Sequence, residues 1–150
     1  MRPVAEPFRL LLRVRYGECD PQGIVFNARY GDYLDVAACE YCRALFGGVD
    51  ASTGIDWRLV RQLTEWKAPA RFDDVLEIHV VTRAVGTTSF TLGFELRRFP
   101  GGPTLVTSVT VYVVVDPRTG QKLPVPERHR EALVAGAAGV LVDQAAVGRG

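Results

Sequence analysis

The segment ECDPQGIVFNARY, residues 18–30, places the carboxylate of Asp20 between an alternating run and a helical run. The alternating run covers Phe8–Tyr16, and the helical run covers Ala28–Phe46. The first N–H groups of a helix have no acceptor inside it and together carry roughly half a positive charge. A carboxylate beside them can act as a nucleophile or general base, while the N–H groups stabilise an oxyanion. The alternative is an ordinary turn, because Asp-Pro commonly initiates turns.

The three cysteines suggest two other kinds of site, for which the sequence offers less support. Cys39 and Cys42 form a Cys-x-x-Cys pair, a spacing found in redox and zinc sites. Zinc needs a full tetrahedral set of ligands, but the only histidines, His79 and His129, are far from the pair in sequence. We therefore predict no metal site. Cys19 has no adjacent histidine to activate it as a nucleophile, so we expect a small buried side chain.

The elements that must position Asp20 are a strand before it and a helix after it. In Phe8–Tyr16, apolar residues alternate with arginines, which predicts a strand buried on one side. In Ala28–Phe46, apolar residues recur at helical spacing. Asn27 is a suitable N-cap residue, and the glycines at positions 47 and 48 supply the stop. A sheet can approach this helix closely at its small residues, which are Gly31, Ala37, Ala38 and Ala44.

Four further strands are predicted between the turn sequences APARFDD, GTT and FPGGP. Their ranges are Trp57–Ala68, Val75–Val85, Thr88–Phe99 and Thr104–Val115. The last is almost wholly apolar, so it should be central in the sheet or covered on both faces. Pro126 then precedes a short helix over Glu127–Ala135. Residues 136–150, rich in Gly and Ala, are predicted to form a flexible tail.

This order of elements predicts the α+β class and one domain over residues 1–150. We expect a curved antiparallel sheet of about five strands wrapped around one long central helix. A single helix cannot cover both faces of such a sheet, so the other face and the edges need another cover. A second copy of the chain supplies it most simply, and we predict a homodimer or homotetramer.

The charge balance argues against two classes of partner. With 18 Lys plus Arg and 17 Asp plus Glu, the formal net charge of +1 gives no electrostatic case for nucleic acid or an anionic membrane. No apolar window approaches the roughly 18 residues of a membrane span. Three cysteines without a signal-peptide pattern favour the reducing cytoplasm over a disulfide framework.

The motif GECDPQGIVFNARYGDYLDVA resembles the signature of the 4-hydroxybenzoyl-CoA thioesterase family, a group of hotdog-fold acyl-CoA thioesterases. Two later segments, PARFDDVLEI and GTTSF, resemble the starts of the family's third and next strands. The similarity covers roughly residues 8–130. It implies a hotdog fold and hydrolysis of a thioester to a carboxylic acid and free coenzyme A. Coenzyme A is then part of the substrate and product, and no separate cofactor is implied.

The resemblance also implies roles for four residues around the start of the helix. Asp20 matches the catalytic carboxylate, and Gly23 matches a glycine that lets the backbone approach the substrate. Asn27 takes the position whose backbone N–H faces the thioester oxygen, and Tyr30 matches a tyrosine one turn into the helix. Whether Asp20 attacks the carbonyl directly or activates water stays open.

A second set of residues is implied to bind coenzyme A. The segment GTTS falls where members of the family contact the pantetheine arm and the nucleotide, and Arg83 is the basic residue nearby. An acyl-carrier protein is an alternative substrate, because both carriers present the same pantetheine thioester. The acyl group itself stays open between an aryl group and a short or medium aliphatic chain. The residues of this set are Arg83, Gly86, Thr87, Thr88 and Ser89.

Other polar residues are expected to have simpler roles. Glu18 could orient or tune Asp20, although a solvated charge is the simpler expectation. Asp35 recurs as an acid in the family's helix, and we expect a structural hydrogen bond from it. Glu65 could enter a neighbouring site, as a carboxylate from an adjoining chain does in a related hotdog branch, but strand carboxylates usually face water. His79 falls on the polar side of its strand and should be exposed.

Two other functions compete with thioester hydrolysis. Hotdog hydratases and dehydratases need a histidine near an acidic residue, and neither the Asp20 loop nor the long helix contains a histidine. A non-catalytic acyl-CoA or acyl-carrier binding module would keep the groove and lose the carboxylate, whereas Asp20 is present. The sequence therefore favours the thioesterase hypothesis.

Overall fold

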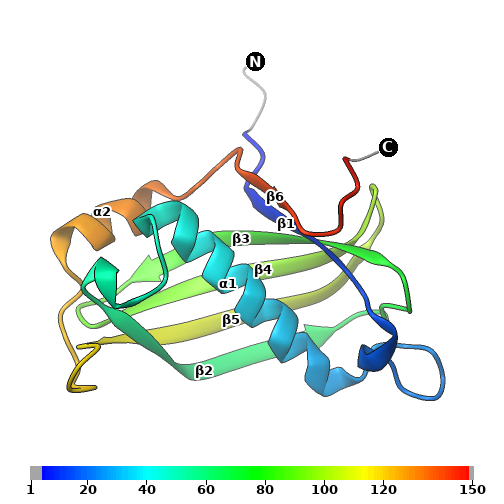
Figure 1. Cartoon of the computed structure of the whole chain (residues 1–150), viewed down its shortest axis with the longest axis horizontal. Coiled ribbons are helices and arrows are strands. Elements are labelled where there is room, and N and C mark those ends of the chain that lie inside the picture. The colour runs from blue at the N-terminus through cyan, green and yellow to red at the C-terminus, as the bar shows by residue number, and fades with distance from the viewer. Residues whose placement is uncertain (1–4, 149–150) are drawn as a thin grey trace.

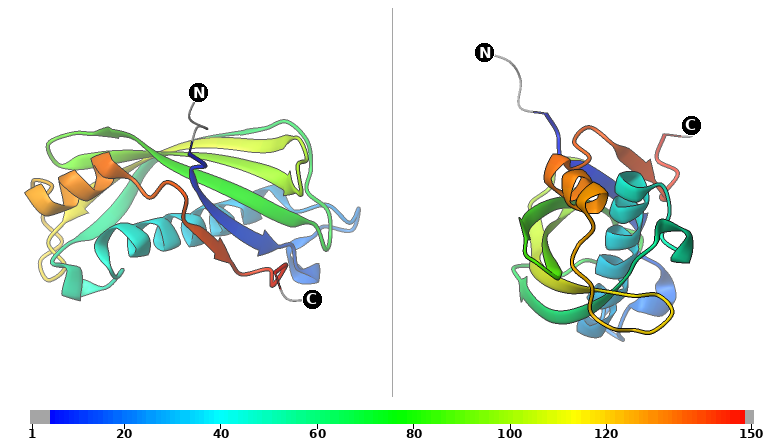
Figure 2. Two further views of the ribbon diagram at one scale, coloured as in Figure 1. Left: turned by 90° about the horizontal axis from the view of Figure 1, so that it is seen from above. Right: turned by 90° about the vertical axis from the view of Figure 1, so that its left-hand side faces the viewer.

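A curved sheet of six strands wraps around one long helix in the computed structural model, which describes residues 5–148 (Figures 1 and 2). The strand order is β2-β5-β4-β3-β1-β6, and all neighbours are antiparallel except β1 and β6. The strands are β1 Phe8–Arg13, β2 Asp56–Trp66, β3 Val75–Val85, β4 Ser89–Phe99, β5 Thr104–Val115 and β6 Leu141–Asp143. The helices are α1 Tyr30–Phe46 and α2 Glu127–Ala135. The predicted α+β class is confirmed.

The sixth strand corrects the prediction of a flexible tail after Gly136. Within residues 136–148, β6 pairs in parallel with β1, from Arg9 opposite Leu141 to Leu11 opposite Asp143. The backbone N–H of Gln144 also donates to the carbonyl oxygen of Leu11 at 2.9 Å. The richness in Gly and Ala suggested fraying, but these backbone hydrogen bonds need no large side chains. The sheet therefore has one strand more than expected, and residues 149–150 lie outside the described residues.

The helical run begins later than its sequence pattern predicted. Asn27–Arg29 form a short 3₁₀ turn, and α1 follows it without a break. The cap positions are held by Phe26 and Arg29, and neither side chain makes a capping hydrogen bond, so the assignment of Asn27 as N-cap is wrong. Gly47, with a φ of 78°, ends α1 as predicted. Neither α1 nor α2 meets the length and hydropathy of a membrane span, and this holds for residues 5–148 as a whole.

One face of α1 is buried against the concave face of the sheet. The same hydrophobic core includes the fully buried Leu76 and Ile78 of β3 and Leu92 and Leu96 of β4. Burying each large apolar side chain stabilises the fold by about 1.5–3 kcal/mol. The apolar spacing of the helix therefore determines how it is rotated against the sheet. The buried residues of α1 are Tyr30, Tyr33, Leu34, Ala37, Ala38, Tyr41 and Cys42.

The two edges of the sheet differ. Beyond β1 the sheet continues into β6, whereas β2 has no neighbour on its outer side among residues 5–148. Most of β2 is exposed, and its large apolar side chains Val60 and Leu63 are 57% and 54% exposed. An edge strand of 11 residues with such side chains offers a template for pairing with another chain.

Because α1 packs closely against the sheet, we expect replacement of two of its alanines by leucine to change the free energy of unfolding by different amounts. Ala37 is fully buried in the core, as expected for a position where the sheet approaches closely. Ala44 is exposed on the same helix, so the expectation of a close approach at Ala44 is wrong. Ala37→Leu should lower the free energy of unfolding by about 1–3 kcal/mol through overpacking. Ala44→Leu should change it by less than about 0.5 kcal/mol. Chemical denaturation measures both, and equal effects would contradict the assignment of the buried face.

Candidate active site

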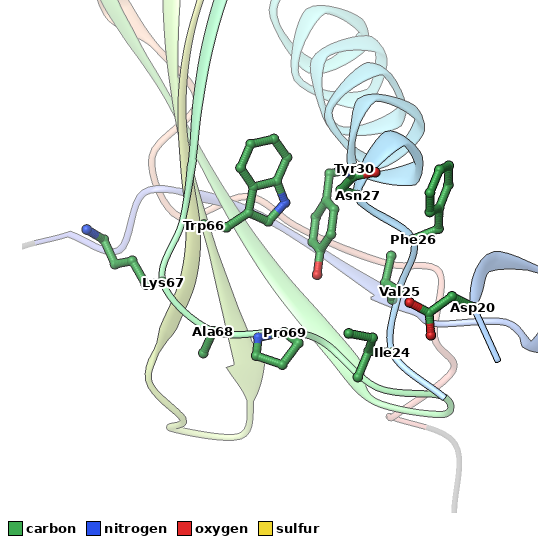
Figure 3. A pocket seen from close by; sticks show the side chains of 10 residues that line it. All are labelled: Asp20, Ile24, Val25, Phe26, Asn27, Tyr30, Trp66, Lys67, Ala68 and Pro69. Atoms are coloured by element: carbon green, nitrogen blue, oxygen red, sulfur yellow. The ribbon is translucent and has the colours of Figure 1, made fainter. Parts of the chain in front are cut away.

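A pocket of about 540 Å³ lies where the start of α1 meets the Asp20 loop and the end of β2 (Figure 3). Three segments line it: the loop before the helix, the first turn of α1, and the chain that leaves β2. Its lining is mostly apolar, with one carboxylate and one ammonium group. The lining residues are Asp20, Ile24, Val25, Phe26, Asn27, Tyr30, Trp66, Lys67, Ala68 and Pro69.

Asp20 is held at the tip of a tight loop and is half-buried. Its backbone N–H donates to the carbonyl oxygen of Ile24 at 2.8 Å, and its own carbonyl oxygen accepts from Gly23 N–H at 2.9 Å. The side-chain Oδ1 accepts a hydrogen bond from the backbone N–H of Gln22 at 2.8 Å. Among residues 5–148, nothing hydrogen-bonds to Oδ2. One carboxylate oxygen thus fixes the side chain, and the other stays free beside the pocket.

Gly23 serves the loop rather than the pocket surface. Its φ of +77° lies in the left-handed region, where a side chain would be strained. A Cβ built there meets nothing within 4 Å, so space is not the reason for glycine. Gly23 borders a neighbouring hollow with the exposed aromatic rings of Tyr16 and Phe72, which lie edge-on at 5.8 Å. The structure therefore requires glycine at this position for the turn that presents Asp20.

Asn27 and Tyr30 both line the pocket. Within the described part of the chain, the backbone N–H of Asn27 has no hydrogen-bond acceptor, as expected for the first residue of a helical turn. Tyr30 is buried, and its hydroxyl oxygen accepts a hydrogen bond from the backbone N–H of Ala70 at 3.1 Å. Its ring lies edge-on to Trp66, with centroids 6.0 Å apart. Tyr30 thus joins the start of α1 to the chain that follows β2.

Glu18 is buried, so the expectation of a solvated charge is wrong. Only 7% of the residue is exposed. Oε1 accepts hydrogen bonds from Arg15 N–H at 2.7 Å and from the Tyr33 hydroxyl at 2.9 Å, while Oε2 accepts from Arg15 Nη2 at 2.9 Å. Burial acts to raise the pKa of Glu18, but hydrogen bonds from Arg15 and Tyr33 outweigh it and lower the pKa overall. Sequence spacing could not reveal the bond from Tyr33, which lies 15 residues away on α1.

The cysteines and histidines do not join Asp20 in the pocket. Burial raises the pKa of Cys19, which favours the less nucleophilic thiol. Cys42 is fully buried on α1, and residues 5–148 contain no cluster of metal-ligating side chains. His79 Nε2 lies 2.6 Å from Glu77 Oε2, and most of the His79 side chain is buried. The expectation of an exposed side chain is therefore wrong. His129 is buried on α2 against Phe46. A hydratase-type histidine is therefore missing from the pocket lining.

The residues expected to bind coenzyme A lie away from Asp20 within one chain. The Asp20 loop bridges through Ile24 to Arg71, in the segment that leads into β3. From there β3 runs to the opposite end of the sheet (Figure 1). Gly86–Ser89 form the turn at that far end, where Arg130 of α2 donates to the carbonyl oxygen of Gly86 at 2.8 Å. Arg83, near the same end of β3, lies over Gly93. One protomer therefore does not bring this set together with Asp20.

Two other carboxylates stay outside the pocket, and several residues that line it were not selected from the sequence. No described residue hydrogen-bonds to Asp35, so the expected structural bond is not formed within residues 5–148. Glu65 is exposed beside Trp66 on β2, and adjacent strand residues face opposite sides, so Glu65 points away from the pocket. Trp66 and Lys67 line the pocket, but the sequence analysis did not select them. The sequence did offer one indication, because the aromatic Trp66 is adjacent to Glu65, which was considered as a possible site residue.

Comparison with known proteins identifies the family. A family model described as "Thioesterase superfamily" matches residues 22–104 of the chain. The chain belongs to the thioesterase superfamily. The "Acyl-CoA thioester hydrolase YbgC" of Escherichia coli is 33% identical over 113 residues, which cover 73% of this chain and 83% of the relative. The predicted recognition and the prediction of a thioester hydrolase are confirmed.

Solved structures support the same fold. A hypothetical protein from Aquifex aeolicus is 27% identical and superposes with a TM-score of 0.75, over 85% of this chain and 99% of its own. A hypothetical protein from Staphylococcus aureus, solved in complex with CoA, has a TM-score of 0.80 at 11% identity, over 90% of this chain and 86% of its own. At that identity the likeness shows the fold alone. The predicted hotdog fold of this superfamily member is confirmed.

The buried carboxylate of Glu18 should make stability depend on pH in one direction. Because its pKa is lower in the folded chain, ionised Glu18 stabilises the fold. This contribution is complete above the unfolded pKa, about 4.3 for a free glutamate, and is lost as pH falls through the folded pKa. Glu18→Gln should therefore lower the free energy of unfolding at neutral pH and have a smaller effect at about pH 3.

Urea denaturation of wild type and variant at the two pH values measures this difference. Glu131→Gln, at an exposed position of α2, is the matched control and should show little effect at either pH. A Glu18→Gln effect that grows toward acid pH would contradict the assigned direction of the pKa shift.

Proposed function

We propose that the protein hydrolyses acyl-CoA thioesters at the pocket beside α1, with Asp20 as the catalytic carboxylate. The observation that carries this proposal is the free Oδ2 of Asp20 at the mouth of a mostly apolar pocket that begins at a helix N-terminus. Family membership supports thioester hydrolysis as the reaction. The name of the E. coli relative supports coenzyme A as the group that carries the acyl chain. An acyl-carrier protein that presents the same pantetheine thioester is the alternative substrate.

Two chemical routes fit a single carboxylate. In the first, Asp20 attacks the thioester carbonyl carbon, the C–S bond breaks, and coenzyme A leaves as a thiolate that takes a proton from water. A second water then cleaves the mixed anhydride, releases the carboxylic acid and restores Asp20. In the second route, Asp20 takes a proton from water while that water attacks the carbonyl carbon. The C–S bond of the tetrahedral intermediate then breaks, coenzyme A leaves as a thiolate, and the proton passes from Asp20 to it, which releases the carboxylic acid and restores Asp20. A thiolate is a good leaving group, so neither route needs the histidine that the pocket lacks.

The backbone at the start of the helical segment supplies the oxyanion donor in this proposal. The N–H of Asn27 has no acceptor within residues 5–148, and Asn27 lines the same pocket as Asp20. A preorganised donor aimed at a developing oxyanion contributes about 3–4 kcal/mol to transition-state stabilisation in other acyl-transfer enzymes. Tyr30 and Trp66 then form an aromatic wall for the substrate. This wall suits an aryl group or a short to medium aliphatic chain.

The protein is proposed to act as a homodimer joined through β2. This strand is an open edge with exposed apolar side chains, whereas the opposite edge continues into β6. Antiparallel pairing of two β2 strands would extend the sheet across both chains. It would also bring the far end of the partner's sheet toward the Asp20 pocket. Gly86–Ser89, which lie at that far end, would then contact coenzyme A from a neighbouring copy.

The three cysteines are unpaired, which supports the predicted cytoplasmic location. Cys39 and Cys42 lie three positions apart on α1 but form no disulfide. No step of either route uses them.

Removing the charge of Asp20 should abolish turnover without unfolding the protein. Asp20→Asn should lower kcat by about 10²–10⁴-fold, because the amide can neither attack nor take a proton. It can still accept the hydrogen bond from Gln22 N–H, so the melting temperature should stay close to wild type. Release of free thiol from a panel of acyl-CoA substrates measures the rate.

Asp73→Asn is the matched control for that experiment. Asp73 is exposed on the loop before β3, and it does not line the pocket. This variant should keep wild-type turnover. Wild-type turnover by Asp20→Asn would overturn the proposed role of Asp20. Tight acyl-CoA binding by a wild-type protein that releases no thiol would instead support a binding module.

The open edge predicts where the dimer can be disrupted. Leu63→Glu places a charge on β2 and should shift the protein toward monomer, because pairing would bury that charge. Val134→Glu, at a 72% exposed position of α2, should leave the oligomeric state unchanged. Analytical ultracentrifugation of both variants and wild type measures this. A dimer that withstands Leu63→Glu and dissociates with Val134→Glu would place the interface elsewhere.

A further inference from the structure

We propose that Glu18 and Tyr33 are positioning residues, whose hydrogen bond holds the Asp20 loop against α1 in the geometry needed for turnover. The link between this bond and catalysis rests on the proposed function of Asp20. Neither side chain lines the pocket, so both would act through the loop that they anchor.

The contact joins two buried polar groups that are far apart in sequence. Glu18 is 7% exposed and Tyr33 is 2% exposed. The Tyr33 hydroxyl donates to Glu18 Oε1 at 2.9 Å. Arg15 also pairs with this carboxylate, but its side chain is 79% exposed, and an arginine–glutamate pair of this kind can form at a surface. The backbone N–H of Arg15 also donates to Oε1 at 2.7 Å, but Arg15 belongs to the same local segment as Glu18. The bond from Tyr33 is therefore the one that joins the carboxylate to α1.

Glu18 lies at the root of the loop that presents Asp20. Its carbonyl oxygen accepts a hydrogen bond from the backbone N–H of Phe26 at 3.0 Å. Cys19 and Val25 then form an antiparallel bridge, and Asp20 N–H donates to the carbonyl oxygen of Ile24. The two arms of the loop are thus bonded to each other from root to tip. A displacement of Glu18 would move both arms, and Asp20 with them.

Tyr33 carries this connection to the start of α1. It lies one turn after Tyr30, which lines the pocket, and their rings meet edge-on with centroids 5.7 Å apart. The bond to Glu18 therefore sets the loop against the helix end that bears the proposed oxyanion donor. Attack on a carbonyl is sensitive to placement, and a misplacement of about 1 Å can cost roughly 10²-fold in rate.

Tyr33→Phe removes the hydrogen bond and keeps the ring in the core. The expected result is a loss of about 10- to 100-fold in kcat, with KM for the acyl-CoA substrate within about twofold of wild type. Tyr41→Phe is the matched control, because Tyr41 is also buried on α1 and its hydroxyl is bonded to Thr82 Oγ1 at 2.8 Å. It should lower the melting temperature by a similar amount and leave kcat unchanged.

A second measurement tests the anchor without using activity. Hydrogen exchange at the backbone amides of Asp20, Gly23 and Phe26 reports the loop, since each amide is bonded within it. Tyr33→Phe should speed exchange at all three, and Tyr41→Phe should not. If wild type hydrolyses no acyl thioester, the proposed function fails, while the exchange data still support or overturn the anchor.

Glu18→Met provides an independent variant with a side chain of similar size that cannot accept the hydrogen bond. It should reproduce the loss of kcat, and adding Tyr33→Phe to it should cost little more, because the bond from the Tyr33 hydroxyl is already absent. Additive losses in the double variant would overturn the proposal. So would faster loop exchange in Tyr33→Phe with wild-type kcat, or a loss of kcat with unchanged exchange.

Discussion

The burial of one face of α1 in the concave sheet is the constraint on which the rest of the structure depends. It determines where the helix begins, and the pocket is assembled around that point. Two tyrosines one turn apart on α1 then bind the two other segments that form the pocket region to the helix. Tyr30 accepts a hydrogen bond from Ala70 after β2, and Tyr33 donates one to Glu18 in the Asp20 loop. The pocket is thus made of irregular segments, but each is bonded to a packed helix.

The groups that line the pocket fit the thioester hydrolysis that we propose. Asp20 keeps one carboxylate oxygen bonded and the other free, so a reactive group is presented in a fixed direction. Unbonded N–H groups at the start of a helical segment supply positive potential without a metal ion or an arginine. Because a thiolate leaves readily, the reaction does not depend on a strong general acid. In the proposed mechanism, a pocket without a histidine is therefore sufficient for thioester hydrolysis.

A sheet around a single helix leaves surfaces that the chain itself does not cover. On one side, β6 extends the sheet beyond β1, and on the other, β2 presents exposed apolar side chains. The predicted CoA-binding turn at Gly86–Ser89 lies far from Asp20 in the same chain. Both observations favour a site that is completed between copies. In this proposed arrangement, pairing of two copies through β2 would place the coenzyme A-binding turn of one copy near Asp20 of the other.

The sequence by itself determined the features that depend on local spacing. The bounds of β3, β5 and α2 match the predicted ranges. The spacing of apolar residues along each segment predicts which side chains are buried, and this spacing is visible in neighbouring residues. The motif around Asp20 was sufficient to indicate the family. Only the tertiary structure decided that Glu18 is buried, that β6 extends the sheet, and that Gly86–Ser89 lie far from Asp20. These features depend on partners distant in sequence, and only packing brings such partners together.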